Sequence, residues 1–92
     1  ITVNTQLDIT YNNKTLYVDR SGGDITLTWN ASTMQDCKVT IIAVDATGNR
    51  LLITDNDALV TYIGNTIPFD MGLNAYDRLT ITSKGSQIFI YS

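Results

Sequence analysis

The sequence DRLTITSKGSQIFIYS, residues 77–92, decides the fold class of this chain. Apolar residues alternate with threonine through its first half, and β-branched and aromatic residues fill residues 87–91. Strict alternation over a short run is typical of a strand with one buried face. Between the two runs, Ser83-Lys84-Gly85-Ser86 has the composition of a tight turn. The segment therefore predicts a β-hairpin whose second strand runs out at the end of the chain.

The remainder of the chain has the same β-rich character. Its 92 residues include fourteen Thr, eight Asn and nine Asp, but no Glu. Thr favours extended backbone, Asn and Asp favour turns, and good helix formers are sparse. A chain of this length forms one domain with a small core. We therefore expect a single all-β domain over residues 1–92.

Short apolar runs recur at regular spacing along the chain. They predict about eight short strands, arranged as a small antiparallel β-sandwich or a β-barrel-like domain. Asp45-Ala46-Thr47-Gly48-Asn49 is interpreted as a hairpin loop between its flanking strands. No convincing internal repeat is visible. The strands predicted before the closing hairpin span residues 2–10, 15–19, 24–30, 37–44, 50–54, 58–63 and 66–70.

The charge pattern argues against several classes of partner. The net charge is −3, and the six Lys and Arg residues are scattered along the sequence. Without a basic cluster to neutralise phosphates, nucleic acid is not an expected ligand. No run of about 18 apolar residues occurs, which argues against membrane insertion. Because the first residue is Ile1 rather than Met, we expect a fragment or a processed product of a longer chain.

The residues that most enzymes use are missing. There is no His and no Glu, so the commonest general base is absent and only Asp supplies carboxylates. Cys37 shares a predicted strand face with Val39 and Ile41, which indicates a small buried hydrophobic residue. Asp55-Asn56-Asp57 has oxygen ligands that suit Ca²⁺ but fits a turn better. We therefore expect no enzyme activity, no metal site and no cofactor.

Aromatic side chains are the remaining candidates for ligand binding, because exposed Tyr and Trp rings can stack on sugars. Trp29 continues the inward series of Ile25 and Leu27, so we interpret it as part of the core. Tyr11 lies in a predicted turn, and Tyr62 lies opposite its apolar strand neighbours. Tyr11 and Tyr62 are therefore the candidate sugar-stacking residues.

The predicted strands at 37–44 and 87–91 carry apolar residues on both faces. An antiparallel sheet with one solvated face does not show this pattern, so a neighbour should cover the second face. That neighbour is either another copy of the chain or a second sheet of the same chain. We favour another copy. The candidate interface residues are Ile42, Val44, Phe89 and Tyr91.

Three motifs follow one another along the chain: DITLTW at 24–29, CKVTII at 37–42 leading into DATGNRLLI at 45–53, and LTITSKGSQIFI at 79–90. Over roughly residues 8–91 this order resembles the small β-rich C-terminal domains of tailed-bacteriophage tail fibres, tailspikes and tail needles. Many of those domains have Trp in the last strand, whereas Phe89 and Tyr91 stand there in this chain.

The resemblance implies a non-enzymatic viral domain that forms a homotrimer at the end of a fibre. Such a domain serves trimerisation, folding registration or host cell-surface attachment, with a host polysaccharide as the expected partner. It would belong to the virion tail appendage and be assembled in the host cytoplasm. The alternative is a monomeric carbohydrate-binding β-sandwich module of a larger secreted enzyme. A third, weaker possibility is an immunoglobulin-like adhesin or surface-layer module.

Overall fold

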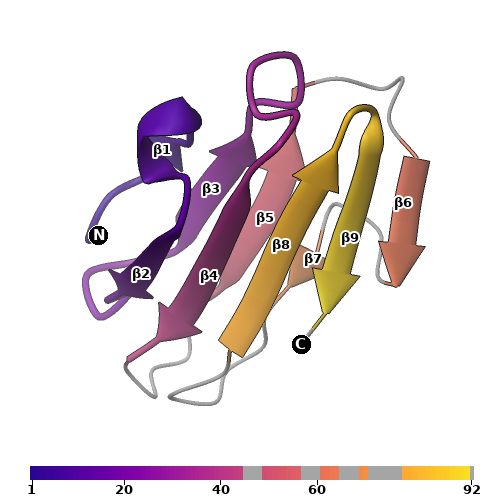
Figure 1. The fold of residues 1–92 in the computed structure, drawn as a ribbon. Helices are drawn as coiled ribbons and strands as arrows, with labels where there is room; N and C mark the ends of the chain where they lie inside the picture. The colour runs from indigo at the N-terminus through magenta and orange to yellow at the C-terminus, as the bar shows by residue number, and fades with distance from the viewer. Residues whose placement is uncertain (45–48, 57–60, 65–68, 71–77, 92) are drawn as a thin grey trace.

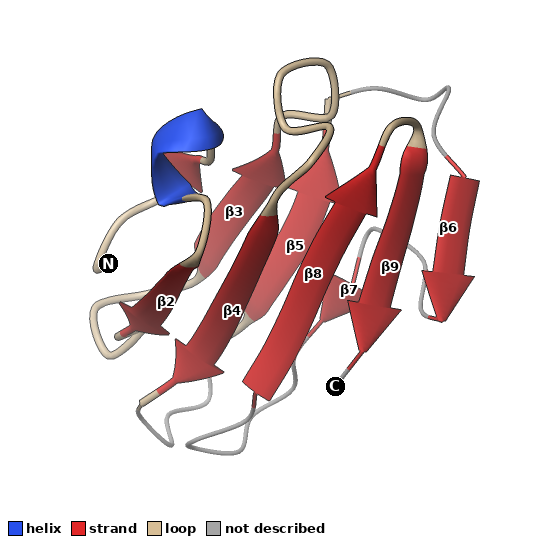
Figure 2. Cartoon of the chain, in the orientation of Figure 1, coloured by secondary structure: helices blue, strands red, loops and turns tan. Residues whose placement is uncertain are grey.

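The computed structural model describes residues 1–44, 49–56, 61–64, 69–70 and 78–91, with backbone alone at 61–64 and 69–70. In these ranges nine strands form two sheets, which lie one behind the other in Figures 1 and 2. The four-stranded sheet has the order β1 (Thr5–Gln6), β3 (Ile25–Trp29), β5 (Leu51–Asp55), β7 (Phe69–Asp70). The five-stranded sheet has the order β2 (Lys14–Val18), β4 (Lys38–Ala43), β8 (Arg78–Lys84), β9 (Gln87–Tyr91), β6 (Thr61–Gly64).

The core lies between the two sheets and follows the alternation of the sequence. In β3, Ile25, Leu27 and Trp29 are buried, whereas the two threonines between them are partly exposed. β-branched threonine suits the outer face because it favours extended backbone. The same two-residue period buries every second residue of β4, β8 and β9. The β-rich character of the described residues is therefore as predicted.

The prediction of antiparallel sheets is wrong, because both sheets are mixed. β1 pairs in parallel with β3, β3 with β5, β2 with β4, and β6 with β9. The antiparallel pairs are β4 with β8, β8 with β9, and β5 with β7. From β1 to β5 each strand lies in the opposite sheet from the strand before it (Figure 1). Consequently β4 and β5, the strands before and after the predicted hairpin loop at 45–49, belong to different sheets and do not pair, whereas residues 45–48 themselves lie outside the described residues.

This alternation creates a structural repeat that the sequence did not reveal. Leu16 pairs with Ile41 in one sheet, and Leu27 pairs with Ile53 in the other. The chain therefore forms one strand in each sheet per coil, and the next coil stacks its strands in parallel beside them, as in a solenoid. Buried Leu and Ile residues occupy equivalent positions in successive coils. What repeats is therefore the pattern of buried positions and not the residue type.

The closing hairpin matches its prediction, whereas the first predicted strand does not. β8 and β9 pair through Lys84 and Gln87, and Gly85 at the turn has φ +59°, which glycine adopts without strain. The segment predicted as one strand over residues 2–10 instead forms the short β1 and a 3-10 helix, Ile9–Tyr11. Asp8 caps this helix by accepting a hydrogen bond from the Thr10 backbone N–H at 2.9 Å, which ends the extended conformation.

Candidate functional site

The outer face of the five-stranded sheet, meaning the face turned away from the core, is the candidate site. Its side chains stand in rows set by the strand register. Tyr17, Ile42 and Arg78 form one row across β2, β4 and β8. The next row contains Thr15, Thr40, Thr80 and Tyr91, and the third contains Lys38, Thr82 and Phe89.

Three of the four predicted interface residues share this face. Ile42 lies between the buried Ile41 and Ala43 of β4, and its own side chain is half-buried. Phe89 is also half-buried, and Tyr91 is 55 % exposed. The fourth, Val44, lies just beyond β4 and is half-buried, with its N–H donating to the Val18 carbonyl at 3.2 Å.

Tyr17 belongs to the same face and was missed from the sequence. It is 59 % exposed and pairs with Ile42 across the β2–β4 ladder. The parallel pairing of β2 with β4 brings the two together, although they are far apart along the chain. The one sequence signal for Tyr17 was the alternation in β2: Leu16 and Val18 on either side of it are apolar and inward, which places the Tyr17 side chain outward.

The strands of the two sheets carry opposite charge. The five strands of the candidate sheet contain cations and no Asp, whereas the four strands of the other sheet contain Asp and no cation. The cations are Lys14, Lys38, Arg78 and Lys84, which are four of the six in the chain. Residues that are scattered along the sequence are thus gathered on one sheet by the fold.

Two shallow hollows lie at the end of this sheet near the β8–β9 turn. The first has a volume of about 270 Å³, and Lys38, Thr82 and Lys84 line it together with residues of the loops before β2 and β4. The second has a volume of about 170 Å³ and is lined by Lys14, Thr15 and Thr40. Both hollows also include Asn13 and Lys38, so they are adjacent. We call the two together the lysine groove.

Hydrogen bonds hold the backbone under the lysine groove. Lys38 donates its N–H to the Asn12 side-chain oxygen at 2.9 Å, and the Asn13 N–H donates to the Lys38 carbonyl at 2.7 Å. Asn13 has φ +61°, a conformation that Asn tolerates better than most residues. The buried Ser83 hydroxyl accepts from the Cys37 N–H at 3.1 Å and donates to the Met34 carbonyl.

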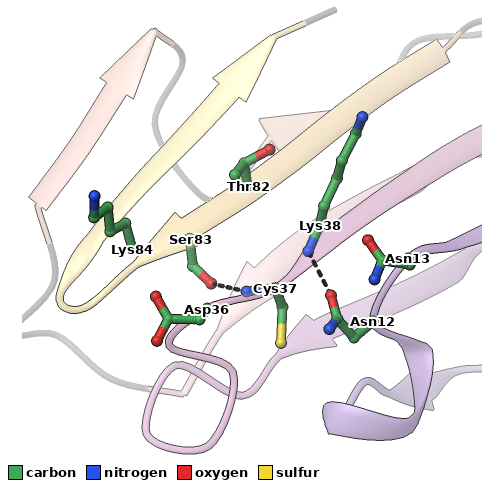
Figure 3. Close-up of a pocket in the computed structure, with 8 residues that line it drawn as sticks. All are labelled: Asn12, Asn13, Asp36, Cys37, Lys38, Thr82, Ser83 and Lys84. Carbon is green, nitrogen blue, oxygen red and sulfur yellow. Dashed lines mark hydrogen bonds between the residues drawn. The ribbon is translucent and has the colours of Figure 1, made fainter.

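Figure 3 shows how these residues divide between the two sides of the sheet. Lys38, Thr82 and Lys84 point to the side away from the core, whereas the hydroxyl of Ser83 and the sulfur of Cys37 point to the other side. Cys37 is 2 % exposed, so its interpretation as a small buried residue is confirmed. Burial raises the pKa of the Cys37 thiol.

The two predicted sugar-stacking residues have different outcomes. Tyr11 belongs to the 3-10 helix and packs half-buried against the core, so the prediction of a freely exposed ring is wrong. Tyr62 belongs to β6, but its side chain lies outside the described residues. Trp29 is fully buried, as predicted.

The Asp55-Asn56-Asp57 segment has a structural role where it is described. Asn56 accepts a hydrogen bond from the Ala31 N–H and donates to the Asn30 side-chain oxygen, both at 3.2 Å. Asp57 lies outside the described residues. Within the described ranges, no group of three or more potential metal-ligating side chains comes together. The described part of the chain also contains no helix that could cross a membrane.

A comparison of this chain with protein-family models, with curated proteins and with solved structures finds no match.

Proposed function

We propose that this chain is a non-enzymatic, two-layer β-sandwich domain that assembles as a homotrimer through the outer face of its five-stranded sheet. One observation supports this above all. Three apolar residues that break the alternation of apolar and polar residues stand on one face together with Tyr17. They are Ile42, Phe89 and Tyr91. The described part of the chain covers none of them completely.

Association through this face has a clear physical driving force. Apolar area removed from water stabilises a complex by about 25 cal/mol per Å². Exposed Tyr rings and half-buried Ile and Phe side chains supply such area, and aromatic residues are enriched in the centres of interfaces. The threonines between them present a flat surface, and the cations Arg78 and Lys38 stand at the ends of the rows of Ile42 and Phe89, so an interface must keep these like charges apart.

The proposed biological setting is the tail appendage of a virion, with a role in host cell-surface attachment. This part of the proposal is supported by the order of the motifs DITLTW, CKVTII and LTITSKGSQIFI along the sequence. A second candidate, a monomeric carbohydrate-binding module, is supported by a different observation. Tyr17 and Tyr91 expose 59 % and 55 % of their surface on a threonine-rich sheet, and such rings can stack on sugars.

The oligomeric state tests the proposed function. We expect sedimentation equilibrium at micromolar concentration to give a trimer, and Ile42→Asp to give a folded monomer, because an unpaired carboxylate in an interface is costly. The melting temperature of the wild type should rise with protein concentration, whereas that of Ile42→Asp should not.

Leu52→Asp provides the matched control for this experiment. Leu52 is half-buried like Ile42, lies one residue from an end of its strand, as Ile42 does, and faces outward on the other sheet. It should leave the trimer intact. A wild type that sediments as a monomer, or a Leu52→Asp variant that dissociates as readily as Ile42→Asp, would contradict the proposal.

A further inference from the structure

Ile1 stands beside β2 at the position where a neighbouring strand would end. Its amino group donates to the Tyr17 carbonyl at 2.8 Å, and the Asp19 N–H donates to the Ile1 carbonyl at 2.9 Å. These two bonds, to the residues on either side of Val18, are the pattern of a parallel pair between Ile1 and Val18. Val18 pairs in parallel with Ala43 of β4. Ile1, Val18 and Ala43 therefore hold equivalent positions in three successive coils (Figure 1).

The rest of this first coil is built like the later ones. After Ile1 the chain crosses to the other sheet, where Asn4 accepts a hydrogen bond from the Thr26 N–H at 2.8 Å. One coil later, Asp24 accepts from the Arg50 N–H at 2.8 Å at the same corner. β1 pairs in parallel with β3, as β3 does with β5. The first coil thus has its strand in the four-stranded sheet, whereas Ile1 alone represents its strand in the five-stranded sheet.

The edge of β2 directs hydrogen-bonding groups to the place of that missing strand. β2 is the outermost strand of its sheet in the described ranges. Neighbouring residues of a strand turn their backbone groups to opposite sides. The Val18 carbonyl accepts from the Val44 N–H on the β4 side, whereas the Tyr17 carbonyl faces the other side. The Tyr17 N–H and the Thr15 carbonyl therefore also point away from β4.

The first coil also carries exposed apolar side chains. Val3 is 66 % exposed and Ile9 is 53 % exposed, which makes them two of the four exposed large apolar residues in the described ranges. Both lie in the segments that link the two sheets within this coil. A terminal coil of a solenoid needs a polar outer face to be stable in water. Apolar residues at this end suit further stacking better than a solvent-exposed end.

We propose that the edge of β2 docks an extended strand of the same polypeptide, which runs parallel to β2 and leads directly into Ile1. A strand from another molecule fits less well, because Ile1 already holds the position beside Val18. In the continued ladder, the residue before Ile1 lies beside Tyr17 and the second residue before it lies beside Leu16. Leu16 is buried, so that second residue has an inward, apolar side chain.

This docking does not rest on the proposed homotrimer. The added strand lies in the plane of the five-stranded sheet, whereas the trimer uses the outer face of that sheet. The two kinds of contact therefore do not compete for the same surface, and a monomeric chain could still dock the strand.

The test adds four residues, Lys-Thr-Leu-Tyr, directly before Ile1 of the full chain. They copy residues 14–17 and so match β2 position by position. Thermal unfolding should give a melting temperature about 4–8 °C above that of the unextended chain, because the added ladder hydrogen bonds and the inward leucine are lost only on unfolding. An unchanged or lower melting temperature would overturn the inference.

The matched control is the extension Lys-Thr-Pro-Tyr. In the proposed ladder the leucine N–H donates to the Thr15 carbonyl. Proline lacks this N–H and places its ring against β2 instead, so the strand cannot pair. The control should keep the melting temperature of the unextended chain. An equal rise in both extended chains would show that the added residues act without pairing, which would refute the docked strand.

Amide hydrogen exchange measured by NMR locates the added strand. The Tyr17 N–H should exchange about tenfold or more slowly in the Lys-Thr-Leu-Tyr chain than in the unextended chain or the proline control. The Leu16 N–H, which faces β4, is the internal reference and should change less. Tyr17 exchange that is already slow in the unextended chain, and slows further as protein concentration rises, would assign the edge to a second copy and overturn the inference.

Discussion

At the scale of single residues, Trp29 shows how the core is packed. Its side chain is fully buried, and its indole N–H has no hydrogen-bond acceptor in the part of the chain that the structure describes. A buried donor without an acceptor costs about 1–3 kcal/mol relative to the same group in water. The large apolar surface of the indole ring outweighs this cost.

Trp29→Phe should therefore be much milder than Trp29→Ala. Phe keeps most of the ring volume and removes the N–H, so we expect a loss of less than about 1.5 kcal/mol in the free energy of unfolding. Ala leaves a cavity, and we expect a loss of about 3–5 kcal/mol. Urea unfolding of both variants measures the difference. Similar losses in the two would show that the indole N–H does find an acceptor.

Cys37 makes stability depend on pH at the alkaline end. Burial raises the thiol pKa above its ordinary value of 9.0, so above that pH the unfolded chain releases a proton that the folded chain retains. The contribution is complete below the ordinary pKa and is lost as pH rises towards the raised pKa. The wild type should thus lose more unfolding free energy between about pH 7 and pH 10 than Cys37→Ala. Parallel losses in the two proteins would contradict this.

At the scale of elements, Asn and Asp side chains join successive coils at the strand ends. Asn4 accepts from the Thr26 N–H at 2.8 Å, Asp24 accepts from the Arg50 N–H at 2.8 Å, and Asn12 accepts from the Lys38 N–H at 2.9 Å. Each bond supplies an acceptor to a backbone N–H just where a strand ladder begins. Asn and Asp suit these places because they favour turns and have short side-chain acceptors.

Asn56 offers the sharpest test of these corner contacts. It accepts from the Ala31 N–H and donates to the Asn30 side chain, so Asn56→Ala removes both bonds. We expect Asn56→Ala to lower the unfolding free energy by about 1–3 kcal/mol. Asn56→Asp keeps the acceptor and loses only the donor, so chemical denaturation should place it between wild type and Asn56→Ala. An Asp variant as unstable as the Ala variant would mean that the donor dominates.

At the scale of the whole molecule, the single chain is already compact. Its radius of gyration is 12.2 Å, close to the value of about 12 Å expected for a domain of this length. Its core is enclosed between the two sheets, so trimer formation would add burial to folded subunits rather than complete a missing core. The strands also differ in charge, with four of the six cations on the strands of one sheet and two of the nine Asp on the strands of the other.

The amino-acid sequence alone determined the inward residues of strands such as β3, although residues 2–10 form only the short β1 and part of a 3-10 helix. The alternation of Ile25, Leu27 and Trp29 with threonine leaves one arrangement that buries the apolar side chains, because successive residues of a strand point to opposite faces. The same reasoning placed Ile42 and Phe89 on an outer face. Local chemistry also predicted the Gly85 turn, since glycine adopts positive φ without strain.

Only the tertiary structure decided which strands pair. Backbone hydrogen bonds are the same for every residue type except proline, so no local pattern distinguishes the parallel pairing of β2 with β4 from a hairpin of β4 with β5. Packing of side chains far apart along the chain makes that choice. Because of it, Tyr17 lies beside Ile42, and Lys14 and Lys38 line one hollow although they are far apart in the sequence.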